Sequence, residues 1–327
     1  MKVKSVAKTQ NLVLGFVQNQ GALLALVALL LFGALRYQGF FAAYNFSELL
    51  RYNSMFGLVA LGMAFVIMTG GIDLSVGSIA ALTSVLAAHL SPQGLLPALI
   101  LPVLAGMVLG LTNGILIAKL KILPFIVTLA TLLAARGLAL LAARNQSVSV
   151  AIDTGVTGFG QGNFLGLPIP AIVMFVAFLI GVLVLQYSSF GRHVLAIGGN
   201  EEASRLMGLS VDTIKILVYT ISGGLAGLAG VILAAQFGAG QPTEGSGWEL
   251  SAIASVVVGG TLLTGGKGSI GTTLVGVLLL GLIFNVLNFE NGYGVISLSA
   301  YWQSVIRGGF LLFVVILQTR LVQNQKT

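Results

Sequence analysis

The segment SSFGRHVLAIGGNEEASRLMGLSVDTI, residues 188–214, interrupts an otherwise apolar chain and decides how the rest of it folds. It concentrates charged and ionisable side chains, namely Arg192, His193, Glu201, Glu202, Arg205 and Asp212. Sequence of this polarity is not stable in hydrocarbon, where unpaired polar groups cost several kcal/mol each. The segment therefore predicts an aqueous connection between two membrane spans.

The centre of this connection has the signals of a short helix, predicted over residues 201–207. Asn200 is a favourable N-cap, and two glutamates follow in the first turn, where the helix dipole favours anions. Gly208 can adopt the left-handed conformation that ends a helix, and Leu206 and Met207 form a small apolar edge. These features favour a compact projection that docks into a groove on another protein. The alternative is an ordinary solvated loop.

Composition indicates a polytopic membrane protein of the all-α class. Of the 327 residues, 57% are hydrophobic and only 8% are charged, and the mean hydropathy is +1.02. A soluble domain carries about 25% charged residues. The chain has no Cys, which excludes disulfides and thiolate metal sites. Its net charge of +7 is typical of basic cytoplasmic loops and does not indicate nucleic acid as a partner.

Apolar runs predict about ten transmembrane helices, of which some are broken or re-entrant at the second/third and eighth/ninth junctions. A short interfacial helix capped by Asn45 is expected over 46–52, and 144–168 is the longest stretch without expected structure. The spans cover about residues 21–35, 53–69, 78–90, 95–118, 125–143, 169–187, 213–237, 248–264, 272–289 and 298–318. Glycines repeat at helix-packing intervals on two of them, at Gly106, Gly110 and Gly114 and at Gly223, Gly227 and Gly230.

Loop charges predict the orientation. Lys and Arg residues number eleven on the side that holds both termini and residues 188–212, against three on the other side (Arg36, Arg51 and Arg144). Cytoplasmic loops carry this excess, so both termini are expected in the cytoplasm and the loops 144–168 and 239–248 outside. The predicted organisation is a cytoplasmic segment 1–20, a single transmembrane domain 21–318 and a cytoplasmic tail 319–327.

Two glycine-interrupted junctions resemble each other. TGGIDLSVGS (69–78) and TGGKGSIGT (264–272) align with one gap, each between apolar runs. Paired broken spans in a transporter often mark the translocation path, although Gly-Gly turns are also common in membrane helices. Together with polar residues at membrane depth, they predict a path or gate formed by Gly70, Gly71, Asp73, Ser75, Asn113, Gly265, Gly266 and Asn285. Asp73 could instead cap the third span, and Arg136 could pair with a carboxylate or with helix carbonyls.

The sequence carries no catalytic constellation. Residues 261–268, TLLTGGKG, differ from a phosphate-binding loop because Thr261 stands where that motif needs Gly and Gly268 stands where it needs a hydroxyl. This excludes an ATPase site of that type in the chain. His89 and His193 lie in different regions, so no shared metal site is expected. No series of acids suggests a proton relay, which argues against a proton-coupled secondary transporter.

Long motifs at 60–82, 120–138, 190–209 and 241–283 together resemble the ribose/xylose/galactose-type permeases of bacterial ABC importers, over about residues 45–320. The clearest are ALGMAFVIMTGGIDLSVGSIAAL (60–82) and FGRHVLAIGGNEEASRLMGL (190–209). The resemblance implies an inner-membrane permease without a cofactor of its own, paired with an identical or different second permease. It also implies a cytoplasmic ATPase that binds ATP and Mg, and a periplasmic sugar-binding protein.

The resemblance also gives roles to particular residues. Glu202-Ala203-Ser204, with Gly208 four residues further on, is similar to the family's coupling helix, which rests on the ATPase. The coupling residues are thus expected to be Asn200, Glu201, Glu202, Ala203, Ser204, Arg205, Leu206, Met207 and Gly208. Relatives usually carry Asp where this chain has Ser251, so sugar choice or partner pairing is expected to differ if that Asp shapes the path.

The function expected from these features is monosaccharide import by alternating access. A polar path between two permeases spares a sugar the cost of unpaired hydroxyls in lipid, and ATP-driven closure of the partner ATPases would switch the path between the two sides of the membrane. The alternatives are a branched-chain amino acid permease of the same superfamily, a self-sufficient secondary transporter and a membrane enzyme.

Overall fold

The structure is a computed structural model that describes residues 21–292 together with residues 302, 305, 306, 308, 309 and 312. It is a helical bundle in which six of the described helices are long and apolar enough to cross a membrane, namely α2, α4, α5, α7, α10 and α12. The chain is therefore a multi-pass membrane protein. Its helices are Gly21–Arg36, α2 (Ala43–Met68), α3 (Val76–Leu90), η1 (Ser91–Gln93), α4 (Leu95–Lys119), α5 (Pro124–Ala142), α6 (Val156–Gln161), α7 (Ile169–Tyr187), α8 (Ser189–Gly199), α9 (Glu201–Leu206), α10 (Val211–Phe237), α11 (Trp248–Val258) and α12 (Ile270–Gly292).

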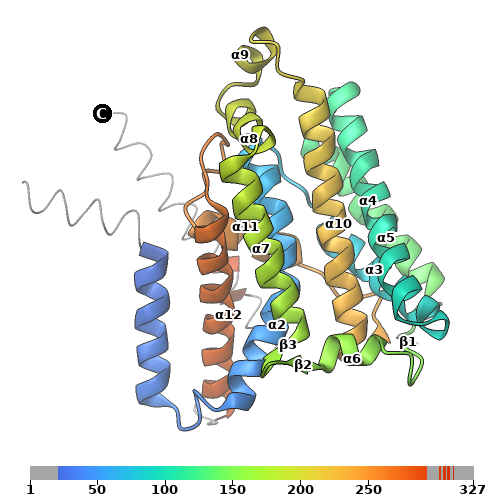
Figure 1. Cartoon of the computed structure of the whole chain (residues 1–327), viewed down its shortest axis with the longest axis vertical. Helices are drawn as coiled ribbons and strands as arrows, with labels where there is room; N and C mark the ends of the chain where they lie inside the picture. The colour runs from blue at the N-terminus through green and yellow to red at the C-terminus, as the bar shows by residue number, and fades with distance from the viewer. Residues whose placement is uncertain (1–20, 293–301, 303–304, 307, 310–311, 313–327) are drawn as a thin grey trace, which may run out of the picture.

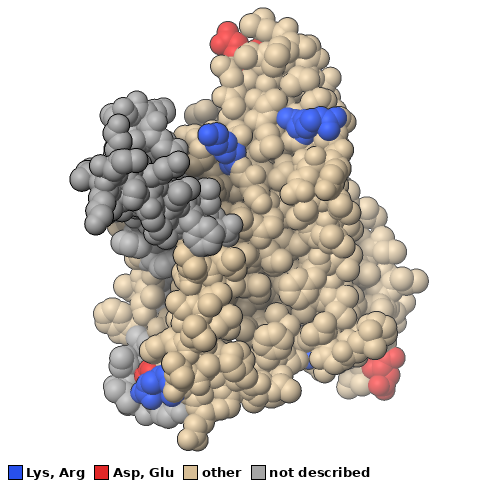
Figure 2. Space-filling model, turned by 60° about the vertical axis from the view of Figure 1, so that its left-hand side comes forward, with Lys and Arg blue, Asp and Glu red and all other residues tan. Residues whose placement is uncertain are grey.

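The long helices run side by side between two ends of the molecule. Helices α8 and α9 lie at one end, called here the α9 end, and α6 lies at the other, called the α6 end (Figure 1). On the face shown in Figure 2, charged side chains gather at the two ends and the broad band between them is almost free of charge. This distribution is expected of a protein whose middle contacts hydrocarbon.

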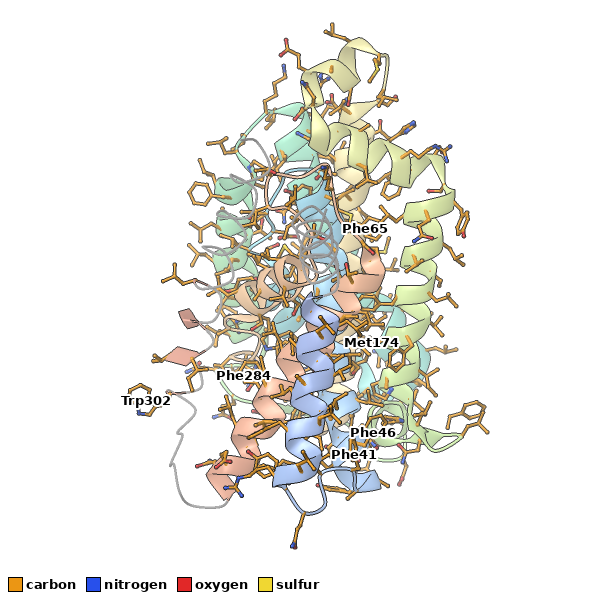
Figure 3. All side chains as sticks on the ribbon, turned by 90° about the vertical axis from the view of Figure 1, so that its left-hand side faces the viewer. Phe41, Phe46, Phe65, Met174, Phe284 and Trp302 are labelled. Atoms are coloured by element: carbon orange, nitrogen blue, oxygen red, sulfur yellow. The ribbon has the colours of Figure 1, made fainter. Side chains whose placement is uncertain are left out.

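Helix α2 is the centre of the bundle. Its side chains are buried almost without interruption from Leu50 to Met68. It runs through the bundle from the α6 end, with Phe46 low and Phe65 higher in Figure 3 and Met174 of α7 between them, and α9 lies beyond its far end (Figure 1). Small residues allow its neighbours to approach closely, since a Cβ added at Gly57 would collide with Met174 and one at Gly62 with Ser222 of α10.

Helices α4 and α10 pack backbone to backbone through the glycines that the sequence singled out. A Cβ added at Gly106 would overlap the Gly223 carbonyl oxygen, and one at Gly110 would overlap that of Tyr219. The predicted packing role of these glycines is confirmed. Because lipid supplies no hydrophobic drive between helices, such close contact is what holds them together.

Several sequence-based boundaries were wrong. The separate interfacial helix at 46–52 does not exist, because α2 begins at Ala43 and continues through it. The stretch 144–168, expected to lack structure, contains α6, the strand β1 (Val148–Ser149) and the hairpin of β2 (Asn163–Phe164) and β3 (Leu167–Pro168). Strand β1 pairs with β4 (Ala239–Gly240), far away in sequence. The expected span 298–318 and both terminal segments lie outside the residues described continuously.

The expected eighth span, residues 248–264, is only partly helical, because helix α11 covers Trp248–Val258. Residues 241–247 before it run along α3 as turns. The Gln241 amide donates to the Ser84 hydroxyl (3.1 Å), and further along the Gly245 carbonyl lies directly against Gly77. The sequence predicted an outside loop over 239–248, but the segment instead descends into the bundle beside α3.

Candidate functional site

Helices α8 and α9 form the projection at the α9 end, and local sequence explains both. The Ser188 hydroxyl accepts from the Gly191 amide (3.1 Å) and caps α8. The Asn200 side chain accepts from the Ala203 amide (2.9 Å), which confirms the predicted cap of α9. Gly208 has φ +84° and donates to the Arg205 carbonyl, so it ends α9 as predicted. Helix α8 was missed, because the sequence placed its residues in a loop.

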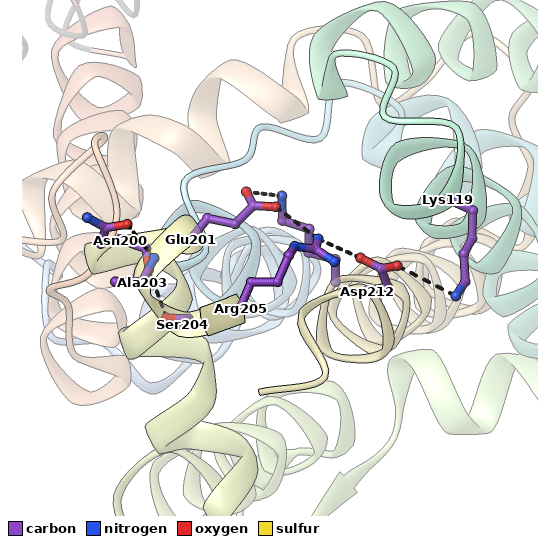
Figure 4. A network of polar contacts seen from close by, with 8 residues as sticks. Lys119, Asn200, Glu201, Ala203, Ser204, Arg205 and Asp212 are labelled. Carbon is purple, nitrogen blue, oxygen red and sulfur yellow. Dashed lines mark hydrogen bonds and ion pairs between the residues drawn. The ribbon is translucent and has the colours of Figure 1, made fainter. Parts of the chain in front are cut away.

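Ion pairs fasten α9 to the spans beneath it (Figure 4). Glu201 bonds Lys215 of α10 at 2.5 Å and lies 3.6 Å from Arg205. Arg205 reaches Asp212 of α10 at 2.8 Å, and Asp212 in turn lies 3.6 Å from Lys119 of α4. The hydrogen bond to Asp212 raises the pKa of Arg205 above its ordinary value, so the guanidinium stays charged. Glu201 and Arg205 therefore orient α9 from within the chain.

The outer surface of α9 is apolar. Leu206 is 84% exposed and Met207 is 71% exposed. Glu202 is also exposed, whereas Ser204 is buried and its hydroxyl donates to the Asn200 carbonyl (2.8 Å). Of the nine predicted coupling residues, Glu202, Leu206 and Met207 are thus available to a partner, and Asn200, Ser204 and Gly208 shape the helix.

Five glycines from three segments meet beside this projection, in what we call the glycine junction (Gly70, Gly198, Gly199, Gly265 and Gly266). The Gly266 amide donates to the Met68 carbonyl at the end of α2 (3.0 Å). A Cβ added at Gly198 would overlap both of these atoms, and one added at Gly265 would lie 2.8 Å from the Gly70 amide nitrogen. The two segments that look like a repeat in the sequence therefore touch each other and the last turn of α8.

A buried polar network follows the first of these segments. Asp73 is fully buried and accepts from the amide (3.0 Å) and hydroxyl (2.6 Å) of Ser75 and from the hydroxyl of Ser222 (2.9 Å). Asn113 donates to the Ser75 hydroxyl (3.1 Å) and accepts from Thr131 (2.5 Å). The network joins the α2–α3 connection to α4, α5 and α10. The N-cap of α3 is Ser75, so Asp73 does not cap that helix.

Asn285 lies apart from the other predicted path residues. Its amide donates to the Asn45 side chain near the start of α2 (2.8 Å), at the α6 end. The structure thus brings Asp73, Ser75 and Asn113 into one cluster and Gly70, Gly265 and Gly266 into the glycine junction. Gly71 lies between the two, with its backbone beside the Tyr219 hydroxyl.

A cavity of about 490 Å³ opens between α9 and the α4–α5 turn. Gly70, Gly71 and Tyr219 line its inner part, and the charged residues Lys121, Glu201, Glu202, Arg205 and Lys215 are also in its lining. The Tyr219 hydroxyl donates to the Ile72 carbonyl (3.4 Å), one residue before Asp73. Among the described residues, no cluster of three or more His, Cys, Asp or Glu side chains could hold a metal ion.

Two arginines hold backbone in place. Arg51 of α2, for which the sequence predicted no contact, donates to the Gly160 carbonyl (2.9 Å) and to Asn163 (3.1 Å), and thereby anchors the α6 region. Arg136 of α5 donates to the carbonyls of Pro242 (2.5 Å) and Glu244 (2.6 Å) in the turns before α11. The sequence predicted a carboxylate or helix carbonyls as partners of Arg136, and the observed partners are carbonyls of a turn segment instead. An arginine inside an apolar run was the available signal in the sequence.

Comparison with known proteins agrees with this architecture. The family described as the branched-chain amino acid transport system / permease component matches residues 45–315. The chain belongs to this family. It is 42% identical to the ribose import permease protein RbsC of Bacillus subtilis (strain 168), with 94% of each chain covered.

Two further family members carry the names of other sugars. The chain is 35% identical to the L-arabinose ABC transporter permease protein AraH of Azospirillum brasilense, covering 95% of this chain and 90% of that one. It is 31% identical to the xylose transport system permease protein XylH of Haemophilus influenzae, covering 91% and 95%. No solved structure gives a significant match. The predicted resemblance to sugar permeases is confirmed, and the chain is a transport component.

Proposed function

We propose that the chain is the transmembrane subunit of an ATP-driven importer that carries a monosaccharide of the ribose, arabinose or xylose type across the bacterial inner membrane. The observation that carries this proposal is the sequence identity of 31–42% between this chain and permeases named for these sugars, over nine tenths or more of each chain. Its partners would be a second permease, identical or not, a cytoplasmic ATPase that binds ATP and Mg, and a periplasmic sugar-binding protein.

The proposed orientation places the α9 end in the cytoplasm. The described basic residues at that end are Lys119, Lys121, Arg192, Arg205, Lys215 and Lys267, whereas Arg36, Arg51 and Arg144 belong to the α6 end. Cytoplasmic loops carry such an excess. The proposal keeps about ten spans, with residues 21–318 as one permease domain and residues 1–20 and 319–327 in the cytoplasm.

We further propose that α9 is the coupling helix that rests on the ATPase. Its exposed Leu206 and Met207 form a small apolar surface between charged residues, which suits insertion into a groove of a partner protein. The ion pairs from Glu201 and Arg205 to α10 hold α9 in a defined orientation, so a push on α9 would reach the spans directly. Alternating access would follow from movement of α9 and the glycine junction together.

The proposed gate consists of the segments 69–78 and 264–272, which meet in the glycine junction. Gly265 and Gly266 lie in backbone contact with α8, Gly265 also contacts Gly70, and Asp73, Ser75 and Asn113 form the polar network that follows Gly70. A gate at this position would couple the projection to the interior of the bundle. Asn285 would act elsewhere, as a packing residue between α12 and α2.

The decisive experiment is uptake by the importer reconstituted in liposomes with its ATPase and binding protein. We expect uptake of ribose, arabinose or xylose that depends on ATP and on both partners. Import of leucine with no sugar uptake would favour the branched-chain amino acid alternative that the family's description names. Uptake without any ATPase would identify a secondary transporter.

The coupling role has a separate test. Leu206→Ala with Met207→Ala should release the ATPase during purification, or abolish its stimulation by the loaded binding protein, because truncation of a buried anchor commonly costs about 2 kcal/mol or more. A matched control is Phe164→Ala with Leu165→Ala, since these side chains are 61% and 88% exposed at the opposite end. Full stimulation and normal stoichiometry in the α9 variant would make α9 a merely solvated turn.

A further inference from the structure

One surface of the bundle carries charged side chains far from both ends of the molecule. This surface, called here the Arg136 patch, consists of Arg136, Glu244, Ser246 and Glu249. Arg136 is partly buried and holds the segment 241–247 in place. It donates to the carbonyls of Pro242 and Glu244 and to the Ser246 hydroxyl. Glu244 and Ser246 are exposed and Glu249 is partly exposed. Among the described residues, neither glutamate forms an ion pair within 4.0 Å.

The depth of the patch follows from its neighbours. Gly245 lies against Gly77 in the first turn of α3, and that helix ends at Leu90, beside the loop at the α6 end. The intervening helix is about 20 Å long at 1.5 Å per residue. The ring of Trp248 lies 4.8 Å from that of Phe56, halfway along α2. Since the hydrocarbon core is about 30 Å thick, the patch reaches the middle of the membrane.

Lipid cannot cover such a surface. Exposed carboxylates at this depth are costly in hydrocarbon, and residues of this kind face a bundle interior or a water-filled cavity. The backbone gives an independent argument. Residues 241–247 form turns rather than a helix, and non-helical backbone is tolerated at membrane depth only where protein buries it or where it lines water. Both observations require a polar neighbour on this face.

We propose that the Arg136 patch lines the sugar path on the face that the chain turns toward the second permease, with Glu244 and Glu249 accepting hydrogen bonds from sugar hydroxyls. The chemistry fits a neutral polyol, because a carboxylate accepts from hydroxyl pairs without needing a charge on its ligand. Arg136 acts as a positioning residue that holds the segment through its carbonyls. The sugar part of this inference rests on the proposed function.

Exposure to water is tested first, in the assembled importer, since the chain has no Cys of its own. Thr243→Cys places a thiol at an exposed position of the segment, and Leu138→Cys is the matched control, since Leu138 is 50% exposed on α5. Residues 136 and 138 are about 200° apart around that helix, so they face different neighbours. A charged methanethiosulfonate should modify Thr243→Cys at least about tenfold faster than Leu138→Cys, because the reagent does not enter lipid. Equally slow modification of both would overturn the proposal.

Contact with sugar is tested by neutral replacements. Glu244→Gln and Glu249→Gln should each lower ribose uptake at least about tenfold, which corresponds to a loss of about 1.4 kcal/mol. Purification with the ATPase should be unchanged. The control Asp153→Asn removes an exposed acid just before α6 and should stay within about twofold, as expected for a surface substitution.

The positioning role of Arg136 is tested by the protection of Thr243→Cys against modification. In the wild-type background, ribose-loaded binding protein with ATP should slow modification of Thr243→Cys. Arg136→Lys keeps the positive charge but not the fork of donors, so this protection should weaken while unprotected reactivity stays high. Protection that is unchanged in Arg136→Lys would overturn its positioning role.

The uptake and labelling results distinguish failure of the proposed sugar contact from failure of the proposed function. Normal ribose uptake by Glu244→Gln and Glu249→Gln overturns the sugar contact even if Thr243→Cys reacts rapidly. Glu244 is exposed, so its replacement tests the contact even if Glu249→Gln fails to fold. If the importer carries leucine instead, the proposed function fails, whereas rapid modification of Thr243→Cys would still identify this face as the lining of a path.

Discussion

The glycine junction gives the sharpest prediction, at Gly198. A Cβ at this position would overlap two backbone atoms, the Met68 carbonyl oxygen and the Gly266 amide nitrogen, and backbone cannot rotate away as a side chain can. Overpacking of this kind costs about 1–3 kcal/mol, and we expect the upper part of that range. The neighbouring Gly199 is the control, because a Cβ there meets nothing within 4 Å and both residues lie in α8.

Gly198→Ala should therefore lower the thermal midpoint of the purified complex by about 5 °C or more relative to Gly199→Ala. Gly198→Ala should also lower the rate of uptake. If about 2 kcal/mol of strain falls on one of two transport states, their equilibrium shifts about 30-fold. Uptake per ATP hydrolysed would then fall, although the ATPase still binds. Thermal unfolding, purification with the ATPase and reconstituted uptake measure these effects separately.

A second matched pair covers the case in which Gly198→Ala fails to assemble. Gly265 and Gly260 both have positive φ, +82° and +87°, so Ala is strained at both, but only Gly265 has neighbours that its Cβ would strike. Equal stability and uptake within both pairs would refute the reasoning. An assembly defect in Gly198→Ala and Gly265→Ala, with normal controls, would make the junction a folding element without a role in coupling.

Further predictions concern the other parts of the chain. Asn200→Ala removes the cap of α9 and should weaken coupling by about 1 kcal/mol, seen as partial loss of ATPase stimulation with an unchanged membrane part. Gly110→Leu should lower the yield of folded protein, whereas Gly137→Leu, with open space around it, should not. Asp73→Asn removes a charged acceptor of three hydrogen bonds and should lower stability by about 1.5–3 kcal/mol and slow uptake; an unchanged thermal midpoint and rate would count against the network. Leu206→Cys should react with an impermeant thiol reagent in inside-out vesicles stripped of the ATPase and not in intact spheroplasts, since α9 is assigned to the cytoplasm.

Local signals in the sequence were sufficient for much of the structure. Apolar runs long enough to cross a membrane predicted the six long helices, because hydropathy depends only on neighbouring residues. The cap at Asn200 and the stop at Gly208 act within one or two turns, so α9 was predicted within one residue of its observed end. Glycines at intervals of four on α4 predicted a close helix contact, although not that α10 is the partner.

Tertiary structure decided what local signals do not contain. Residues 241–247 descend into the bundle because Ser84 and Arg136 bond their backbone and Gly77 leaves room for it, and hydropathy cannot distinguish such a segment from an outside loop. The contacts that bring Gly70, Gly198 and Gly265 together join residues more than sixty positions apart, so the sequence identified the segments of Gly70 and Gly265 without indicating that they touch, and it did not single out Gly198. Hydropathy, capping and turn preferences act over a few residues and fix where spans begin and end. Backbone approach and burial of charge depend on how the spans pack, and only the folded chain determines that.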